Sequence, residues 1–158
     1  PESAVNQVLA DLTVSLLDDR LFTVVREQLG ATYGGSSAVT FDEGGSAADL
    51  TVSVDGDPAR LDEIVAAVGS ELNALATGQV AGADFGEAQA VLQNRYNYVD
   101  HDQILEALLD EGRDPATVVD PDQALDVLAH VTPAQLAGFV SRFTGSPNRI
   151  DVRAVPTS

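Results

Sequence analysis

Apolar residues recur at helical spacing along residues 5–29, which predicts a long amphipathic helix near the start of the chain. The run SLLDDR, residues 15–20, interrupts this pattern, and we expect a break or joint there. Gly30 follows the last apolar position and is a candidate C-terminal cap, because glycine readily adopts the left-handed conformation that ends many helices. The helix is therefore expected to end just before a stretch of small residues.

Two stretches after this helix alternate between inward and outward positions, a pattern typical of strands with one buried face. The second is DLTVSVD, residues 49–55, and DEGGSAAD, residues 42–49, separates the two with turn-forming residues. The sequence therefore predicts an antiparallel hairpin. The first stretch spans residues 31–41, and one of its faces carries Tyr33, Gly35, Ser37, Val39 and Phe41.

The rest of the chain is mainly helical, and most of the predicted helices have a start signal of their own. Asp57 before Pro58 opens a helix that we expect to end at Gly78. Asp84 and Glu87 stand at capping-box spacing and are expected to open the next helix. Further helices are predicted at HDQILEALLDEG (residues 101–112), after Asp120 before Pro121, and after Thr132 before Pro133 with Gln135 at the capping-box position.

The order of elements predicts the fold class. The chain closes on RIDVRAV, residues 149–155, whose alternation predicts a final strand. Helix, strand, strand, several helices and strand indicate one α+β domain, a two-layer sandwich with helices packed on one face of a mostly antiparallel sheet. The helix that opens at Asp84 is expected to bury Phe85, Ala88, Val91, Leu92 and Tyr96.

Composition narrows the classes of function. The net charge of −17, with eight arginines and no lysine, repels phosphate backbones and anionic headgroups, so we expect no nucleic-acid partner and no membrane partner. Without cysteine there is no disulfide framework and no thiolate zinc site. The chain starts without methionine and has no apolar run that would span a bilayer. We expect a soluble piece of a longer polypeptide, and a cytoplasmic location is favoured although the sequence does not fix the compartment.

Self-contained catalytic chemistry is not evident in the sequence. His101 and His130 lie far apart, outside any HxxEH or HExxH spacing, and are expected to be surface or helix-end residues. The acidic clusters lack the ligand order of an EF-hand loop. No GxSxG elbow is present, and the absence of lysine removes lysine-based mechanisms. We therefore expect no catalytic centre, no metal and no cofactor in this chain.

One segment has a specific resemblance. DDRLFTVVREQLGATYGG, residues 18–35, resembles a segment of the pitrilysin/insulinase family of zinc metallopeptidases, in which S-R-L-F-x-x-[LV]-R-E-x-x-G-[LA]-x-Y closes a long helix and leads into a strand. Weaker similarity extends over nearly the whole chain. The positions in register are Arg20, Leu21, Phe22, Arg26, Glu27, Gly30 and Tyr33.

The resemblance implies that residues 1–158 are one C-terminal-type domain of a clamshell of two homologous domains. In that family the N-terminal domain carries HxxEH and the zinc, so zinc is expected in a partner domain. The strand that usually precedes the first helix is missing, and this would leave a sheet edge open to pairing. The implied partners are a peptide substrate and a zinc-bearing N-terminal domain or subunit, and a homodimer stays open.

The resemblance also implies that Arg26 and Tyr33 reach across the chamber and hold the substrate main chain near the scissile bond. Guanidinium and phenol are both donors that suit a peptide carbonyl or its oxyanion. The spacing alone is also explained if Arg26 neutralises the negative end of its helix and Tyr33 is a half-buried aromatic residue of the strand. The full motif favours the functional role. Two alternatives stay open: a non-catalytic structural or assembly homologue, and a small-molecule or peptide-binding module unrelated to proteolysis.

Overall fold

The computed structural model describes residues 2–24, 35–42, 47–98 and 119–154 of the chain. Residues 22–24 continue the first helix as a wider π-helical turn. The described elements, in chain order, are α1 (Glu2–Leu21), β1 (Gly35–Phe41), β2 (Ala48–Val54), the 3₁₀ helix η2 (Pro58–Arg60), α2 (Leu61–Ala76), α3 (Gly82–Asn97), α5 (Pro121–His130) and α6 (Pro133–Thr144).

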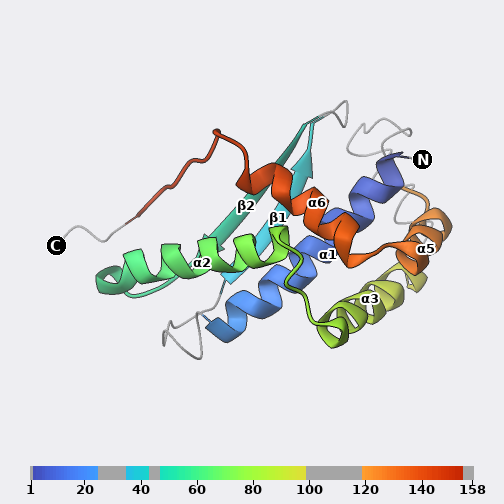
Figure 1. Ribbon diagram of the computed structural model, residues 1–158, viewed down its shortest axis with the longest axis horizontal. Helices are drawn as coiled ribbons and strands as arrows, with labels where there is room; N and C mark the ends of the chain where they lie inside the picture. The colour runs from blue at the N-terminus through green and yellow to red at the C-terminus, as the bar shows by residue number, and fades with distance from the viewer. Residues whose placement is uncertain (1, 25–34, 43–46, 99–118, 155–158) are drawn as a thin grey trace.

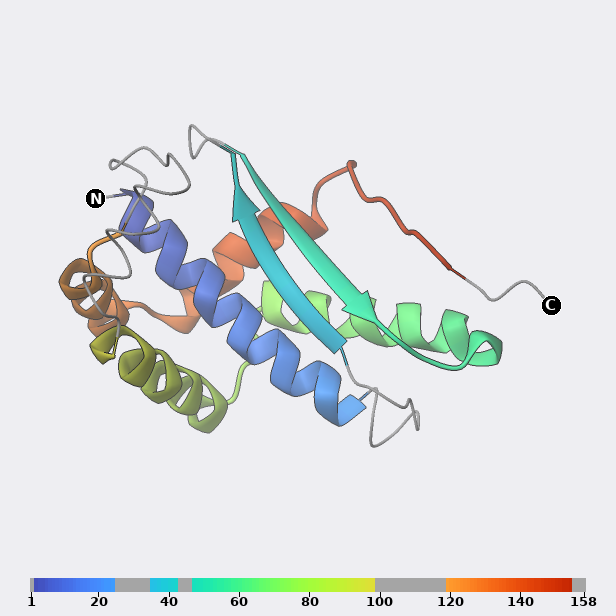
Figure 2. The ribbon, with the colours of Figure 1, turned by 180° about the vertical axis from the view of Figure 1, so that it is seen from behind.

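Strands β1 and β2 form an antiparallel hairpin with helices on one side of it. The register runs from Gly35 opposite Val54 to Phe41 opposite Ala48. In both strands alternate residues are half-buried and exposed, so one face meets the helices and the other meets solvent. Figures 1 and 2 show the hairpin on one side of the molecule and α1, α2 and α6 on the other. The predicted α+β class, with an antiparallel sheet and helices on one face, is confirmed.

Helix α1 is the centre of the core. Its buried positions include four completely inaccessible apolar residues, and the buried Thr13 is satisfied because its hydroxyl donates to the Leu9 carbonyl at 2.7 Å. Side chains from α2, α3, α5 and α6 join the same cluster, and the inward residues of the hairpin pack against it. The four inaccessible residues of α1 are Val8, Leu12, Leu17 and Leu21.

The prediction of a break or joint at residues 15–20 is wrong, because α1 runs through these residues without a break. Leu16 and Leu17 stay buried, so the apolar stripe continues. The polar residues of this run bond to other elements: Asp18 accepts from β1, and Arg20 contacts α2 and the loop after it. Because α1 contacts other elements on several sides, it carries polar residues close to its apolar stripe. In the sequence these polar residues look like the end of a helical pattern.

Most predicted helix starts are confirmed. Asp57 caps η2, which leads directly into α2, and Asp120 caps α5. Thr132 and Gln135 form a capping box at the start of α6. Gly78, where the sequence predicted the end of this helix, follows α2 and has φ 75°, in the left-handed region common after helix ends.

The predicted start of α3 is wrong. The helix begins at Gly82 without a side-chain cap, so Asp84 lies inside its first turn. Val91, expected to be buried, is 48% exposed because it lies on the face next to the buried stripe. That stripe consists of Phe85, Ala88, Leu92 and Tyr96, as the sequence predicted for these four.

The predicted closing strand is also wrong over its described part, because residues 149–154 are extended but belong to no sheet. Ile150 and Val152 are 85% and 86% exposed, and in the described chain the sheet consists of β1 and β2 alone. Alternation produces a strand only where a neighbouring strand offers backbone partners. In Figure 2 this segment runs in roughly the same direction across the view as β2 but does not join its sheet. The predicted helix at residues 101–112, the Gly30 cap and residues 31–34 of the first strand lie outside the described residues.

Gly35 sits where the hairpin meets the end of α1, and we expect Gly35→Ala to lower the free energy of unfolding by about 1 to 3 kcal/mol. An added Cβ would lie 3.2 Å from Val54 Cγ2 and 3.3 Å from Leu21 Cβ, so packed atoms would have to move. Urea unfolding followed by circular dichroism measures the change. Gly69→Ala in α2 is the control, since its Cβ meets nothing within 4 Å and should leave stability equal or higher. Equal stability of both variants would contradict the close packing at Gly35.

Candidate functional site

The candidate residues Arg26 and Tyr33 lie outside the described residues, in the segment that links α1 to β1. We call residues 22–34 the junction. The structure describes its first residues, 22–24, and the strand that begins at Gly35, directly after it. The site is therefore built from the side chains that hold these two ends.

The two ends of the junction are tied to each other. The Ser37 hydroxyl near the start of β1 donates to Asp18 Oδ1 in the last turn of α1 at 2.7 Å. Leu21, the last residue of α1, is completely buried against the position of Gly35. One polar and one apolar contact thus bring the end of the helix against the start of the strand.

Arg20 ties the same helical turn to a different part of the fold. Its Nη2 donates to the Gln79 carbonyl at 2.7 Å, and its Nη1 lies 3.4 Å from Glu71 Oε2. The Arg20 and Glu71 side chains are only 16% and 22% exposed. The last turn of α1 is therefore held by β1 on one side and by α2 and the loop after it on another.

A second polar cluster joins the middle of α1 to α3. The Tyr96 hydroxyl donates to Asp11 Oδ2 at 2.5 Å, and Gln7 Nε2 donates to Asp11 Oδ1 at 2.9 Å. Burial raises the pKa of Tyr96 far above its ordinary value, and the hydrogen bond to Asp11 and the charge of that carboxylate raise it further. Tyr96 stays a neutral donor and has a structural role.

We expect Tyr96→Phe to lower the free energy of unfolding by about 1.5 to 3 kcal/mol, because it removes a hydrogen bond to a charged group. The raised pKa also sets the pH dependence: the contribution is complete below the ordinary phenol pKa of 10.0 and is lost as the pH rises above it, where the unfolded state ionises first. Unfolding curves at pH 8 and near pH 10.5 measure both effects. Tyr98→Phe, at a residue 86% exposed, is the control and should change neither. If the two variants behave alike, the bond from Tyr96 to Asp11 does not stabilise the fold.

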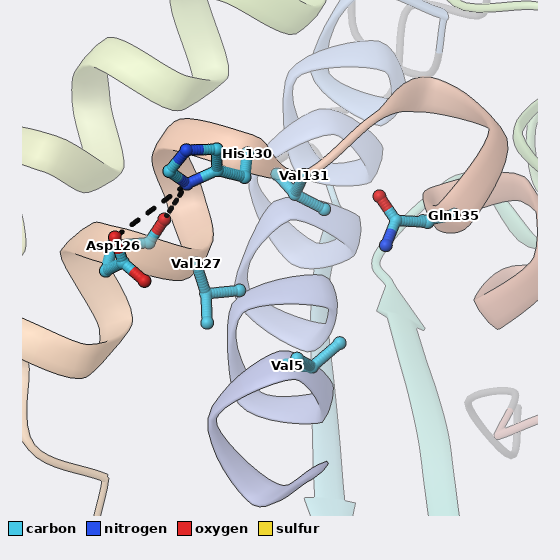
Figure 3. A pocket seen from close by; sticks show the side chains of 6 residues that line it. All are labelled: Val5, Asp126, Val127, His130, Val131 and Gln135. Carbon is cyan, nitrogen blue, oxygen red and sulfur yellow. Dashed lines mark hydrogen bonds and ion pairs between the residues drawn. The ribbon is translucent and has the colours of Figure 1, made fainter. Parts of the chain in front are cut away.

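A shallow pocket of about 210 Å³ lies between α1, α5 and α6 (Figure 3). The His130 ring has its Nδ1 2.8 Å from the Asp126 carbonyl, and the Gln135 side chain accepts from Thr132 in the cap of α6. The polar groups of this pocket are thus engaged by their own helices. His130 is an exposed helix-end residue, as predicted, whereas His101 lies outside the described residues.

The described residues show neither a metal-binding group nor a membrane-spanning helix. They contain no group of three or more His, Asp or Glu that could hold a metal ion. Asp84 and Glu87, which the sequence assigned to a cap, instead line a hollow between α3 and α1 together with Asp19. Within the described part, no helix is long and apolar enough to cross a membrane.

Comparison with known protein families shows which family this chain matches. Residues 1–92, which hold α1, the hairpin, α2 and most of α3, match the family described as "Peptidase M16 inactive domain". The chain belongs to this family. The match includes the segment 18–35 with Arg26 and Tyr33, and the resemblance to the non-zinc domain of these metallopeptidases is confirmed. This M16 domain matches no curated protein.

The fold of this M16 inactive domain is similar to a solved structure described as "Crystal structure of a conserved protein from Enterococcus faecalis V583". The TM-score is 0.69 at 17% sequence identity, and the similarity covers 87% of this chain and 33% of the other. At this identity the similarity concerns the fold alone. The chain spans about a third of the length of that protein.

The side chains that hold the junction were not identified from the sequence. The sequence placed Asp18 and Arg20 in a break of the helix and Arg20 also in the family motif, and it placed Ser37 on one face of the first strand. The available signal was the pair of opposite charges in the last turn of a helix that also carries the family motif. Their partners, at residues 37, 71 and 79, are revealed only by the tertiary structure.

Proposed function

We propose that this M16 inactive domain is the substrate-binding, non-zinc domain of a zinc metalloendopeptidase, and that a separate zinc-bearing domain carries out hydrolysis. The observation that carries the proposal is the motif at residues 18–35, which retains both Arg26 and Tyr33 inside the region matched by the family. A domain kept only for assembly would not need these two donors together. Both residues therefore have the role of supporting groups for the substrate.

The chemistry assigned to the pair is the donation of hydrogen bonds to the peptide main chain. A guanidinium group always carries its charge and offers several donors, and a neutral phenol offers one. Both suit a carbonyl oxygen on which negative charge develops during attack at the scissile bond, and fixed donors at that point stabilise the transition state. Peptide main chain, rather than particular side chains, is the recognised feature.

Zinc belongs to the partner domain in this proposal. The chain has no HxxEH motif, and the part that the structure describes holds no cluster of potential metal ligands. A zinc ion bound in the partner would polarise the scissile carbonyl and activate water. The residues of this chain would bind and orient the peptide.

Reconstitution with a zinc-bearing M16 domain tests the proposal. A quenched fluorescent peptide is offered to this chain, to the zinc-bearing domain, and to the two together, with chelation by EDTA as a further arm. We expect turnover only from the combination, and its loss on chelation. Equal turnover by the zinc-bearing domain alone would overturn the proposal and favour the non-catalytic assembly homologue.

A further inference from the structure

We propose that residues 149–154 of one copy of this chain add as a strand to the outer edge of β2 in a second copy, so that two copies exchange these residues in a symmetric dimer. We call residues 149–154 the exchange segment. The dimer contact is independent of the proposed function, because it involves neither substrate nor zinc. Two described features require a partner: the exchange segment, and the edge of β2 that faces away from β1.

The exchange segment has the pattern of a strand but pairs with no strand in its own molecule. It is extended, and its Ile150 and Val152 side chains are 85% and 86% exposed. Side chains two residues apart project from the same side of an extended chain, so one side of the segment is apolar. A pair of large apolar side chains left together in solvent indicates a surface that a partner covers. The other side of the segment carries Arg149, Asp151 and Arg153.

The outer edge of β2 offers the complementary half of the contact. In the described chain the sheet consists of β1 and β2, so the backbone groups of β2 that point away from β1 have no strand beside them. Such an edge is a template for an added strand. The inner face of β2 is half-buried and packs against the core, and the outer face is exposed. The inner residues are Leu50, Val52 and Val54, and the outer ones are Asp49, Thr51 and Ser53.

The faces of the two elements match in one way only. Neighbouring strands share their faces, so Ile150 and Val152 would lie beside Leu50 and Val52 and extend the apolar inner face of the sheet. A shift by one residue would direct the charged side of the segment toward the helices, which burial of the inner face disfavours. The alternation that predicted a strand at this place is then explained by pairing between copies.

Charge favours a second copy of this chain as the partner. The exchange segment carries two arginines and one aspartate, whereas the whole chain has a net charge of −17. The segment is therefore attracted to the acidic surface of another copy. The charged residue on the outer face of β2 is Asp49, opposite in sign to both arginines. Arg149 contacts Asp151 at 3.0 Å, but these side chains are 58% and 50% exposed, and such a pair stabilises little.

Within its own molecule the exchange segment is held away from the sheet. Arg153 Nη1 lies 2.6 Å from Asp62 Oδ1 in the first turn of α2, and in this position the segment belongs to no sheet. Each copy therefore has one free segment and one free edge. Two copies satisfy both needs at once when the same contact is made twice, which is the arrangement of a two-fold symmetric dimer. Backbone hydrogen bonds supply the attraction, and the apolar side of the segment selects the face.

Analytical ultracentrifugation of the chain over a range of concentrations tests the dimer. We expect a reversible equilibrium between monomer and dimer. Ile150→Ser combined with Val152→Ser should weaken dimerisation by at least about a hundredfold, because apolar burial is lost in both symmetric contacts. Thermal unfolding of the monomer should not change, since both side chains are exposed in a single copy. Tyr98→Ser is the control, because Tyr98 is 86% exposed elsewhere and should leave dimerisation unchanged.

Introduced thiols identify the surface that the segment occupies, because the chain contains no cysteine of its own. Thr51 and Asp151 lie in the middle of the outer face of β2 and of the polar side of the segment, so they become neighbours whichever way the added strand runs. Oxidation of a mixture of Thr51→Cys and Asp151→Cys should give a mixed disulfide between copies, which mass spectrometry identifies. Ala38→Cys is the matched control: Ala38 lies opposite Thr51 on β1, one strand further from this edge, and should not link to Asp151→Cys.

The double variant Thr51→Cys with Asp151→Cys distinguishes the two possible occupants of the edge. A disulfide between copies, seen as a dimer on a non-reducing gel, supports the proposal. A disulfide within one chain would show that the exchange segment covers its own β2 and would overturn it. The proposal also fails if the chain is monomeric at every concentration, if dimerisation survives the two serine substitutions, or if Ala38→Cys links as well as Thr51→Cys. None of these measurements reads peptide turnover, so the proposed function is tested separately.

Discussion

Arg26→Ala and Tyr33→Phe are each expected to raise the barrier to peptide turnover by about 1 to 4 kcal/mol in the assembled peptidase, the range found when one donor to a developing oxyanion is removed. Tyr33→Phe is the sharper test, since it deletes a single hydroxyl and keeps the ring. The loss should appear in kcat and in kcat/KM, because the interaction strengthens as charge develops on the substrate oxygen. Steady-state kinetics with one fluorogenic peptide provides both constants.

The controls for this prediction are Arg142→Ala and Tyr98→Phe. Arg142 lies in the last turn of α6 and Tyr98 directly follows α3, and both residues are exposed. They should leave the kinetics unchanged. The pair has only a structural role if Arg26→Ala and Tyr33→Phe both keep full turnover while changes to the zinc ligands of the partner domain abolish it.

Leu12→Ala is expected to destabilise the domain by about 2 to 5 kcal/mol, the largest effect that we expect on folding. Leu12 is completely inaccessible in the middle of α1. The hairpin packs on one side of this helix and other helices on the other, so the surroundings cannot collapse into the space that the substitution leaves. Equilibrium unfolding in urea measures the change.

Val91→Ala is the matched control for Leu12→Ala, because it also removes methyl groups from a helix but at a residue 48% exposed. It should change the free energy of unfolding by less than about 1 kcal/mol. A similar loss for both variants would show that burial along α1 does not dominate the stability of the domain.

Local patterns were sufficient to predict much of the fold. The alternation in residues 35–41 and 49–54 identified the faces of the hairpin, because each strand packs one face on the helices. The starts at Asp120 and Thr132 were correct because caps are made by residues that lie close together in sequence. The predicted helix start at Asp84 was wrong because a capping-box spacing also occurs by chance inside the first turn of a helix, where acidic residues are favoured.

Features that depend on contacts between residues far apart in the chain could not be predicted from the sequence. The segment 149–154 has the alternation of a strand, but pairing depends on a neighbouring strand that its own residues do not specify. The partners of Arg20 lie 51 and 59 residues away along the chain. SLLDDR was therefore interpreted as a joint, although its polar residues make tertiary contacts. The motif at residues 18–35 was recognisable because its residues are close in sequence, whereas the contacts that hold the end of α1 join residues far apart in the sequence.

Photocrosslinking of a bound peptide tests most directly whether this chain holds the substrate. A peptide with a photoreactive group next to the scissile bond is bound to the assembled peptidase, whose zinc ligands in the partner domain are substituted to prevent turnover. Because the chain has arginine but no lysine, trypsin divides the junction into fragments at residues 21–26 and 27–60. We expect crosslinks on these two fragments, reduced by Tyr33→Phe. Arg26→Ala removes the cleavage site between them, and there we expect fewer crosslinks on the single fragment 21–60. Crosslinks confined to the zinc-bearing domain, or unchanged by both substitutions, would contradict the proposed role of this domain.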